Sequence, residues 1–195
     1  MPFIAFLGCD GSGKSVVIAG VSERLAAEGY PIHRGHWRPK PFEKSTGSVS
    51  AADNPHGQPA RGVAASMLKL IWLWLNWWVA WFRQLRYQSK SGYLLFDRFH
   101  ADLLVDPTRY RYGGPGGIAR FICAAMPQPD QVIFLDAPPE VLLARKQEVG
   151  FSALEASRAA YLKLVRGRPR FRTVDASRPL ADVIEDVVSH LPHRG

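Results

Sequence analysis

Residues 3–15 read FIAFLGCDGSGKS, an apolar run that leads directly into a glycine-rich turn. The run Phe3–Leu7 has the composition of a buried strand, and Val16–Ala27 carries apolar residues at helical spacing. Between a strand and a helix, a glycine-rich turn that ends in Lys-Ser is typical of a phosphate-binding loop, whose backbone N–H groups face phosphate oxygens. We therefore expect Lys14 to reach the terminal phosphates of a nucleoside triphosphate and Ser15 to ligate Mg²⁺. The alternative is a tight strand-to-helix turn without a ligand.

The composition is that of one ordinary globular domain. The chain has 195 residues, of which 47% are hydrophobic and 22% are charged, enough for one substantial core. Its 25 basic and 17 acidic residues give a formal charge of +8, which suits polyanionic ligands. No tight basic run or nucleic-acid module is present in the sequence, so we expect no nucleic-acid partner. Two cysteines and the lack of a signal-peptide pattern favour a reducing, cytoplasmic location.

Strand-like and helix-like segments alternate along the chain. Strands are expected over Phe3–Leu7, Pro31–Arg34, Tyr93–Phe96, Gln131–Leu135 and Phe171–Val174. Helices are expected over Lys14–Glu28, Val63–Gln88, Gly117–Met126, Pro139–Val149, Ala153–Arg166 and Leu180–Leu191. This alternation predicts a parallel sheet covered on both faces, with ligands bound beyond the carboxyl ends of the strands.

Two segments interrupt the alternation. Residues 36–62 are rich in proline and glycine and predict a long loop, of the kind that is usually a functional lid or disordered. The apolar stretch Leu70–Phe82 would cover ~20 Å as a helix, short of the ~30 Å hydrocarbon core of a membrane. Polar residues recur there every seven positions, which predicts one narrow wet stripe on a helix buried on its other sides, against the sheet and a partner subunit. These residues are Lys69, Asn76, Arg83 and Lys90. Weak membrane-surface contact is the main alternative, and a transmembrane span is not expected.

A second chemical element follows the strand expected at Tyr93–Phe96. Asp97 ends that strand, where a P-loop enzyme needs a carboxylate to hold Mg²⁺ or to accept a proton from the attacking hydroxyl. Arg98 beside it can neutralise a phosphoryl group with two parallel hydrogen bonds. The alternative is a helix-capping Asp with a surface Arg.

Four segments together resemble the thymidylate kinase family of nucleoside monophosphate kinases. They are the loop at residues 8–15, Asp97-Arg98-Phe99, residues 134–140 and residues 175–180, in the family order and across almost the whole chain. The resemblance implies a single three-layer α/β/α P-loop kinase domain over residues 1–195, with a five-stranded parallel sheet of order 2-3-1-4-5. It also implies transfer of the γ-phosphoryl of ATP to dTMP with Mg²⁺, and a homodimer formed through the helix around residues 66–88.

The same resemblance implies roles for individual residues. The catalytic candidates are Lys14, Asp97, Arg98 and Arg145, and Ser15 and Asp97 are the metal candidates. The candidates for binding the ATP donor are Gly8, Asp10, Gly11, Ser12, Gly13, Lys14, Ser15, Val16, Ser177 and Arg178. Arg145 and Lys146 open a short lid over residues 145–156. Because no arginine stands at Gly11 or Ser12, this lid would have to supply the positive charge on the transferring group.

The acceptor side departs from the family pattern. The family's usual Arg-Glu-Pro-Gly-Gly is replaced by His36-Trp37-Arg38-Pro39, and residues 101–114 lack the usual thymine-pocket stretch. We expect a small anionic acceptor bound by Asp10, His36, Arg38, Arg98, Asp102, Arg109 and Arg111. The acceptor is dTMP, another nucleoside monophosphate, or a phosphorylated or carboxylated sugar of surface-polysaccharide metabolism. A non-catalytic nucleotide-binding scaffold that acts through the tryptophan-rich helix is a further alternative.

Overall fold

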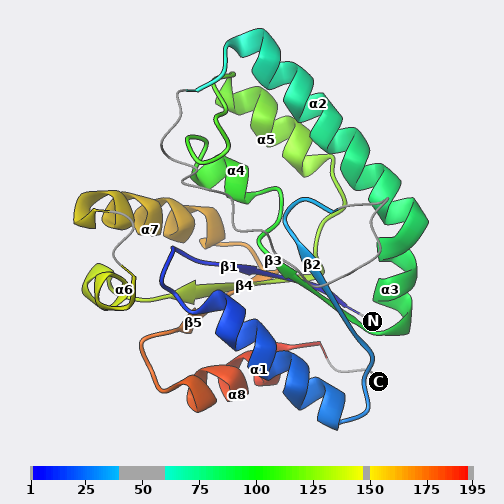
Figure 1. Ribbon diagram of the computed structural model, residues 1–195, viewed down its shortest axis with the longest axis vertical. Helices are drawn as coiled ribbons and strands as arrows, with labels where there is room; N and C mark the ends of the chain where they lie inside the picture. The colour runs from blue at the N-terminus through cyan, green and yellow to red at the C-terminus, as the bar shows by residue number, and fades with distance from the viewer. Residues whose placement is uncertain (1, 40–59, 147–149, 193–195) are drawn as a thin grey trace. The chain divides into compact units, whose positions relative to one another are not determined.

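Five parallel strands form one sheet of order β2-β3-β1-β4-β5 (Figure 1). The computed structural model describes residues 2–39, 60–146 and 150–192. The strands are β1 (Phe3–Leu7), β2 (Ile32–His36), β3 (Tyr93–Asp97), β4 (Gln131–Asp136) and β5 (Phe171–Asp175). The expected parallel α/β fold and strand order are confirmed. Phe6 of β1 lies opposite Asp97 on one side and Ile133 on the other, so the strand that feeds the glycine-rich turn is central and fully buried.

The sheet and most of its helices belong to one compact unit, unit 1, which comprises Met1–Trp37, Tyr87–Phe99 and Pro129–Gly195. Its helices are α1 (Lys14–Ala27), α6 (Pro139–Arg145), α7 (Phe151–Val165) and α8 (Leu180–His190). Helices α1 and α8 pack against each other on one face of the sheet, and α7 packs on β4 and β5 (Figure 1). The apolar strands therefore have helices against them, as expected for a parallel sheet.

A second compact unit, unit 2, comprises Arg38–Arg86 and His100–Gln128. It contains α2 (Val63–Ala80), the π-helical turn η1 (Trp81–Leu85), α4 (Asp102–Val105) and α5 (Gly116–Ala124). Helices α2 and α5 lie side by side, and the Trp78 indole N–H donates to the Ala125 carbonyl at 3.1 Å (Figure 1). Trp77 is fully buried, with its ring edge-on to His100. The expectation of one domain over residues 1–195 stays a prediction.

Several expected boundaries shift. The long helix continues through η1 into α3 (Arg86–Ser91), three residues beyond the predicted end at Gln88, and the short α4 was not predicted. Helix α6 ends at Arg145 because Lys146 is already extended, so the predicted continuation toward Val149 is wrong at Lys146. In the predicted loop 36–62, His36 is the last residue of β2 and residues 40–59 lie outside the described residues. In the predicted lid 145–156, α7 starts at Phe151 and residues 147–149 lie outside the described residues.

The expected wet stripe on the tryptophan-rich helix holds at Arg83 and Lys90, which are exposed, and is wrong at its other two residues. Lys69 and Asn76 are half-buried, and they donate to the carbonyls of Tyr110 at 3.0 Å and Pro39 at 2.7 Å. The periodicity locates polar side chains correctly, but these side chains serve backbone acceptors inside the unit rather than water. The exposed side of α2 and η1 instead carries large apolar residues, namely Leu68, Ile71, Trp72, Leu75, Val79 and Phe82.

Among the described residues, the helical stretch Val63–Ser91 is the one long and apolar enough to cross a membrane by length and composition. Within its most apolar window, 28% of the residues are buried in the protein. Leu70, Leu73, Trp77 and Ala80 form that buried side. The stretch is therefore a partly buried core helix.

Candidate functional site

The glycine-rich turn connects β1 to α1 in unit 1, and its backbone requires glycine at several positions. Gly11 and Gly13 have φ values of +85° and +80°, in the left-handed region that favours glycine. A Cβ on Gly11 would lie 2.8 Å from the Leu142 carbonyl oxygen, and one on Gly8 would lie 2.5 Å from Ser12 Oγ. The turn is thus a tight cradle that closes at Gly13, immediately before α1 begins. Such a cradle at a helix N-terminus is suited to a phosphate.

Lys14 is buried over this cradle. Its Nζ donates to the Gly8 carbonyl at 2.9 Å, to the Cys9 carbonyl at 2.8 Å and to Ser12 Oγ at 3.3 Å. A second closing contact runs from the Ser12 N–H to the Cys9 carbonyl at 3.2 Å. The ammonium is therefore held within the loop that the sequence predicts to bind phosphate, while Ser15 and Val16 are exposed at the start of α1.

Asp97 stands at the carboxyl end of β3, in register with Phe6 of β1 and His36 of β2. Its Oδ1 is buried and has no hydrogen-bond partner among the described residues. A buried carboxylate oxygen without a donor is costly, and a divalent cation is one way to satisfy it. No group of three or more His, Cys, Asp or Glu side chains that could hold a metal occurs in the described part of the chain. One carboxylate and the Ser15 hydroxyl fit Mg²⁺, which binds few protein ligands and completes its shell with water and phosphates.

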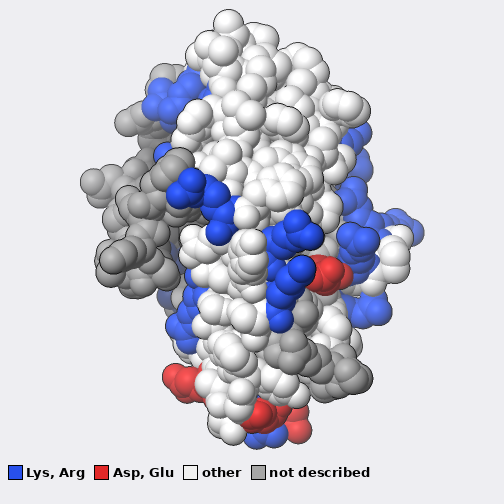
Figure 2. All heavy atoms as spheres, turned by 90° about the vertical axis from the view of Figure 1, so that its right-hand side faces the viewer, with Lys and Arg blue, Asp and Glu red and all other residues white. Residues whose placement is uncertain are grey.

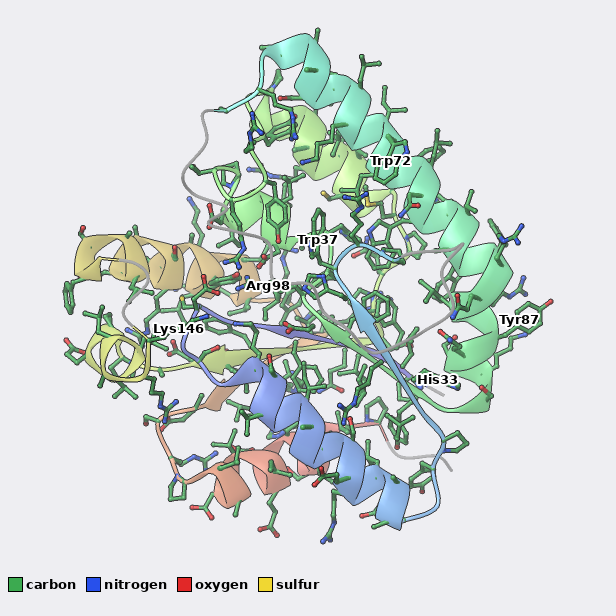
Figure 3. The ribbon with its side chains drawn as sticks, viewed as in Figure 1. His33, Trp37, Trp72, Tyr87, Arg98 and Lys146 are labelled. Carbon is green, nitrogen blue, oxygen red and sulfur yellow. The ribbon has the colours of Figure 1, made fainter. Side chains whose placement is uncertain are left out.

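Arg98 follows Asp97 and adopts a left-handed backbone with φ +64°, just beyond the end of β3 (Figure 3). Its guanidinium is buried, and it donates to Asp10 Oδ1 at 2.7 Å and to the Tyr161 hydroxyl at 2.9 Å. The structure thereby brings together Asp10 of the loop and Arg98, both of which the sequence singled out. Tyr161 on α7 was missed, because its spacing looks like that of an ordinary core aromatic.

A further ion pair lies at the end of β4. Both Asp136 carboxylate oxygens accept from Arg158 of α7, at 2.7 and 2.8 Å, and this pairing raises the pKa of Arg158. The charge of Glu140 also raises the pKa of Arg158. Burial raises the pKa of the Cys9 thiol to about 11, so Cys9 is not a nucleophile at neutral pH. Arg158 was missed because it lies among other charged residues of a surface helix.

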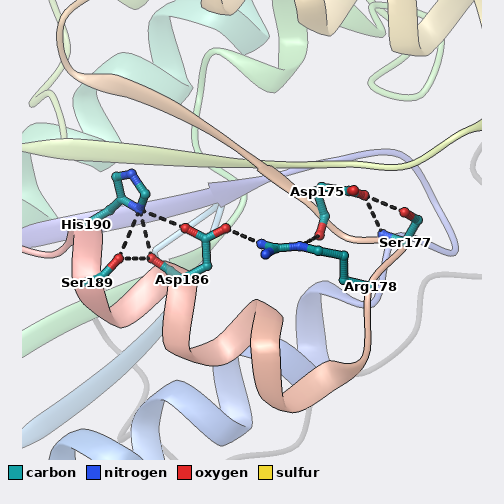
Figure 4. A network of polar contacts seen from close by, with 6 residues as sticks. All are labelled: Asp175, Ser177, Arg178, Asp186, Ser189 and His190. Atoms are coloured by element: carbon teal, nitrogen blue, oxygen red, sulfur yellow. Dashed lines mark hydrogen bonds and ion pairs between the residues drawn. The ribbon is translucent and has the colours of Figure 1, made fainter.

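The segment after β5 forms a network with α8 (Figure 4). Asp175 Oδ1 accepts from the Ser177 N–H at 2.9 Å and from its hydroxyl at 2.6 Å, and these bonds lower the pKa of Asp175. Arg178 makes an ion pair with Asp186 of α8. The Arg145 guanidinium, expected in the lid, donates to the Ala176 carbonyl at 2.9 Å. Arg145, Ser177 and Arg178 are thus gathered near the end of β5.

Unit 2 holds a cluster of cations. Lys69 lies close enough to Arg61, Arg38 and Arg111 for their charges to lower its pKa, and together with burial, the largest cause, they bring this pKa to about 8. The Arg38 guanidinium lies 4.7 Å from the centre of the Trp72 ring. Arg38 and Arg111 were predicted from the sequence, whereas Arg61 was missed and Lys69 was assigned to the wet stripe of the tryptophan-rich helix. Cations gathered this closely are typical of a site for a polyanion.

The other two candidates in unit 2 make local contacts. Asp102 is fully buried, and its Oδ2 accepts from the Tyr110 hydroxyl at 2.5 Å. The Arg109 backbone N–H donates to Asp106 Oδ1 at 2.9 Å, which fixes the turn after α4. Their predicted roles in binding an acceptor stay predictions.

Comparison with known proteins shows a similarity over the whole length of the chain. A thymidylate kinase from Dinoroseobacter shibae is 29% identical to this chain over 210 residues, which cover 96% of the chain and 95% of that protein. No protein-family model matches the chain. The chain is therefore a distant, full-length homologue of a thymidylate kinase, with the parallel sheet of a P-loop nucleoside monophosphate kinase.

Proposed function

We propose that this protein is a cytoplasmic, ATP- and Mg²⁺-dependent phosphotransferase of the thymidylate kinase type. It moves the γ-phosphoryl of ATP to an anionic acceptor, dTMP or another nucleoside monophosphate. One observation carries the proposal: Asp97 ends β3, the strand paired with β1, and its buried Oδ1 has no hydrogen-bond partner within the described ranges, while β1 leads into the phosphate cradle. The full-length similarity to a thymidylate kinase supports it.

The residues proposed to bind ATP, the phosphoryl donor, all lie in unit 1. The loop amides and Lys14 bind the β- and γ-phosphates, and Lys14 exchanges its carbonyl partners for phosphate oxygens. Ser15 and Asp97 hold Mg²⁺, which when bound neutralises charge on the β- and γ-oxygens. Ser177 and Arg178 are proposed to contact the adenine, as the family resemblance implies.

Arg98 is the residue proposed to neutralise the transferring phosphoryl group. Its guanidinium is already desolvated and oriented by Asp10 and Tyr161, so little reorganisation is needed when a phosphate arrives. Asp97 orients the acceptor hydroxyl or accepts its proton. Arg145 and the lid over residues 145–156 are proposed to exclude water, so that the acceptor takes the phosphoryl group.

Recognition of the acceptor is assigned to the cluster of cations in unit 2. Arg38 and Arg111, joined by Arg61 and Lys69, bind the anionic part of the acceptor. His36, Asp102 and Arg109 are the remaining predicted contacts. A homodimer through residues 66–88 stays a prediction.

A second candidate function keeps the same donor chemistry but changes the acceptor to a phosphorylated or carboxylated sugar. It is favoured by the sequence His36-Trp37-Arg38-Pro39, which replaces the family's usual acceptor-side pattern. The cation cluster suits either acceptor, because its chemistry selects a negative charge rather than a base.

The test is ADP formation from ATP with Mg²⁺ in the presence of dTMP, other nucleoside monophosphates and phosphorylated or carboxylated sugars. We expect turnover with a nucleoside monophosphate, and a loss of about 10²-fold or more in Asp97→Asn. The matched control is Glu23→Gln, an exposed carboxylate on α1. Turnover with a sugar alone would favour the second candidate. ATP binding without turnover for any acceptor would contradict both and favour a scaffold.

A further inference from the structure

Positive charge is widespread on the side of the protein where α2 lies, so charge alone does not mark a binding site. Figure 2 looks onto this side and shows more Lys and Arg than Asp and Glu side chains. Lys69 and Arg61 differ from ordinary surface cations, because both are half-buried and both contact the same main-chain oxygen. The Lys69 Nζ lies 3.0 Å from the Tyr110 carbonyl oxygen, and the Arg61 Nη1 lies 3.5 Å from it. One carbonyl therefore helps to place two cations.

Tyr110, which supplies this carbonyl, is also held by its side chain. The side chain is 6% exposed, and its hydroxyl donates to Asp102 Oδ2 at 2.5 Å, the short end of the range for such bonds. Asp102 has no exposed surface at all. A hydrogen bond between two buried groups is costly to break, because neither group can turn to water instead. The bond to Asp102 therefore fixes Tyr110 firmly.

The loop that carries Tyr110 is also tied to the start of α2. The Arg61 N–H donates to the Arg111 carbonyl at 3.0 Å, and the Gly113 N–H donates to Ser66 Oγ at 3.0 Å. The Ser66 hydroxyl in turn donates to the Arg61 carbonyl at 3.3 Å. A Cβ on Gly113 would lie 2.2 Å from that carbonyl oxygen, so the loop approaches α2 more closely than a side chain would allow. The cations and the carbonyl that they contact thus belong to one hydrogen-bonded frame.

Arg111, the next residue after Tyr110, has a left-handed backbone with φ +54°. Within the described ranges, Arg98 and Arg111 are the two non-glycine residues with positive φ. Such a conformation costs free energy and persists where the surrounding contacts impose it, which is common at binding sites. Arg98 is proposed to meet the transferring phosphoryl group and Arg111 the acceptor, so both strained positions carry a guanidinium assigned to an anion.

The frame opposes the mutual repulsion of the cations. The charges of Arg61, Arg38 and Arg111 lower the pKa of Lys69, which shows that these groups lie close enough to repel one another. The partial negative charge of the Tyr110 oxygen counteracts this repulsion for the two cations that contact it. An ammonium has three N–H donors and a guanidinium has five, so these contacts leave Lys69 and Arg61 with donors for an anionic group.

We propose that Tyr110 is a positioning residue for the acceptor site. Its hydroxyl bond to Asp102 fixes the carbonyl that holds Lys69 and Arg61, and these cations then bind the anionic part of the acceptor. The proposal rests on the function proposed above for the cation cluster. It gives the fully buried Asp102 a role through Tyr110, in place of the direct contact with the acceptor that the sequence predicts. Because the frame exists before the acceptor arrives, less conformational entropy is lost on binding.

The test is a calorimetric titration of inorganic phosphate into the full chain. The cradle is first saturated with Mg²⁺ and a non-hydrolysable ATP analogue, so that the heat reports a second anion site. We expect the wild type to bind phosphate and Tyr110→Phe to bind it about fivefold more weakly. The matched control is Tyr112→Phe in the same loop, whose hydroxyl donates to the Pro115 carbonyl at 3.0 Å, and it should bind phosphate as the wild type does. Circular dichroism and binding of the ATP analogue confirm that each variant is folded.

Further variants distinguish positioning from a purely structural role. Lys69→Met should weaken phosphate binding, and adding Tyr110→Phe to it should have a much smaller effect than in the wild type, because Tyr110 acts through Lys69. Asp102→Asn keeps an oxygen that can accept from the Tyr110 hydroxyl, so it should weaken binding less than Tyr110→Phe does. In turnover, Tyr110→Phe should raise the KM for the acceptor about fivefold, while kcat and the KM for ATP change less than about twofold.

Three results would overturn the proposal. The first is a wild type that binds no phosphate once the cradle is filled. The second is a folded Tyr110→Phe variant that binds phosphate as the wild type does. The third is additivity of Tyr110→Phe and Lys69→Met, because the Tyr110 hydroxyl then acts independently of Lys69. All three are measured without turnover, so they are distinct from a failure of the proposed function, which is the absence of ADP formation with every acceptor.

Discussion

Arg98 Nη2 donates to Asp10 Oδ1 at 2.7 Å, and this bond ties the end of β3 to the glycine-rich loop. Both side chains are largely buried, at 7% and 20% exposure, so the pair is poorly screened by water. Arg98 holds this position from a left-handed backbone that a non-glycine residue adopts at some cost. The ion pair therefore positions a guanidinium beside the cradle.

Breaking this pair should destabilise the fold. In Asp10→Ala the buried Arg98 charge loses this ion pair, so we expect the free energy of unfolding to fall by about 2–4 kcal/mol. Tyr161→Phe removes one neutral acceptor of the same guanidinium and should cost about 1 kcal/mol. Urea denaturation measures both. If Asp10→Ala and Arg98→Met have additive effects in the double variant, the two side chains are not coupled.

Metal dependence should be traceable to Asp97. With ATP, Mg²⁺ is expected to raise the melting temperature of the wild type above its value with ATP and EDTA, because a metal-bound nucleotide gains the Asp97 contact. Asp97→Asn should bind ATP but show no added effect of Mg²⁺. Glu23→Gln serves as the control and should behave as the wild type. If Mg²⁺ raises the melting temperature of Asp97→Asn as much as that of the wild type, Asp97 is not a metal ligand.

Acceptor affinity should weaken at alkaline pH. Burial and three neighbouring arginines hold the pKa of Lys69 at about 8, below its usual 10.5. Lys69 therefore loses its positive charge as the pH rises through 8, and the KM for an anionic acceptor should rise several-fold between pH 7 and pH 9. Lys69→Met should show a high KM that no longer changes over this range, whereas the exposed Lys163→Met should follow the wild type. A wild-type KM that does not change between pH 7 and pH 9 would show that Lys69 does not bind the acceptor.

Acid should destabilise unit 2 through His100. This side chain is almost fully buried, and burial lowers its pKa from 6.5 to about 4. Between these values the unfolded chain binds more protons than the folded one, so stability rises with pH and is lost as the pH falls from 6.5 toward 4. The loss attributable to His100 is about 3 kcal/mol. In His100→Gln this part of the slope should disappear, and in the half-buried His33→Gln it should persist.

Two glycine-to-alanine substitutions should change the free energy of unfolding in opposite directions. A Cβ on Gly35 of β2 would lie 2.1 Å from the Phe96 ring, which is 1% exposed and cannot move freely. Gly35→Ala should therefore cost about 1–3 kcal/mol in thermal or urea unfolding. Gly117 lies in α5 with nothing within 4 Å of its Cβ position, so Gly117→Ala should stabilise the protein by about 0.5–1 kcal/mol. A destabilising Gly117→Ala would contradict the packing of α5.

The sequence predicted the sheet well because its strands are buried on both faces. Phe3–Leu7 and Gln131–Leu135 are continuous apolar runs with turns beside them, and both form strands where expected. The strand order came from the family resemblance, since periodicity alone does not say which strands are neighbours. Helix α4 was missed because four residues are too few to show a helical period.

The site was only partly predictable, for a different reason. Glycine spacing and Lys14 reveal the loop directly, because the backbone conformation demands those residues. Tyr161, Arg158 and Lys69 carry no such signature, since their contacts depend on tertiary structure and distant residues. The predicted wet stripe was wrong at Lys69 and Asn76 for the same reason: their spacing does not say which carbonyl groups they contact.

The hydrogen bonds of Lys14 within the loop compete with the bonds that it would make to a bound nucleotide. Two main-chain oxygens and one hydroxyl already solvate its ammonium, so a triphosphate gains only the difference between its own oxygens and theirs. An anion of low charge does not displace these loop oxygens from the ammonium, whereas a polyphosphate carries enough charge to do so. When ADP dissociates, the ammonium returns to the same loop oxygens. This return favours release of ADP and therefore turnover.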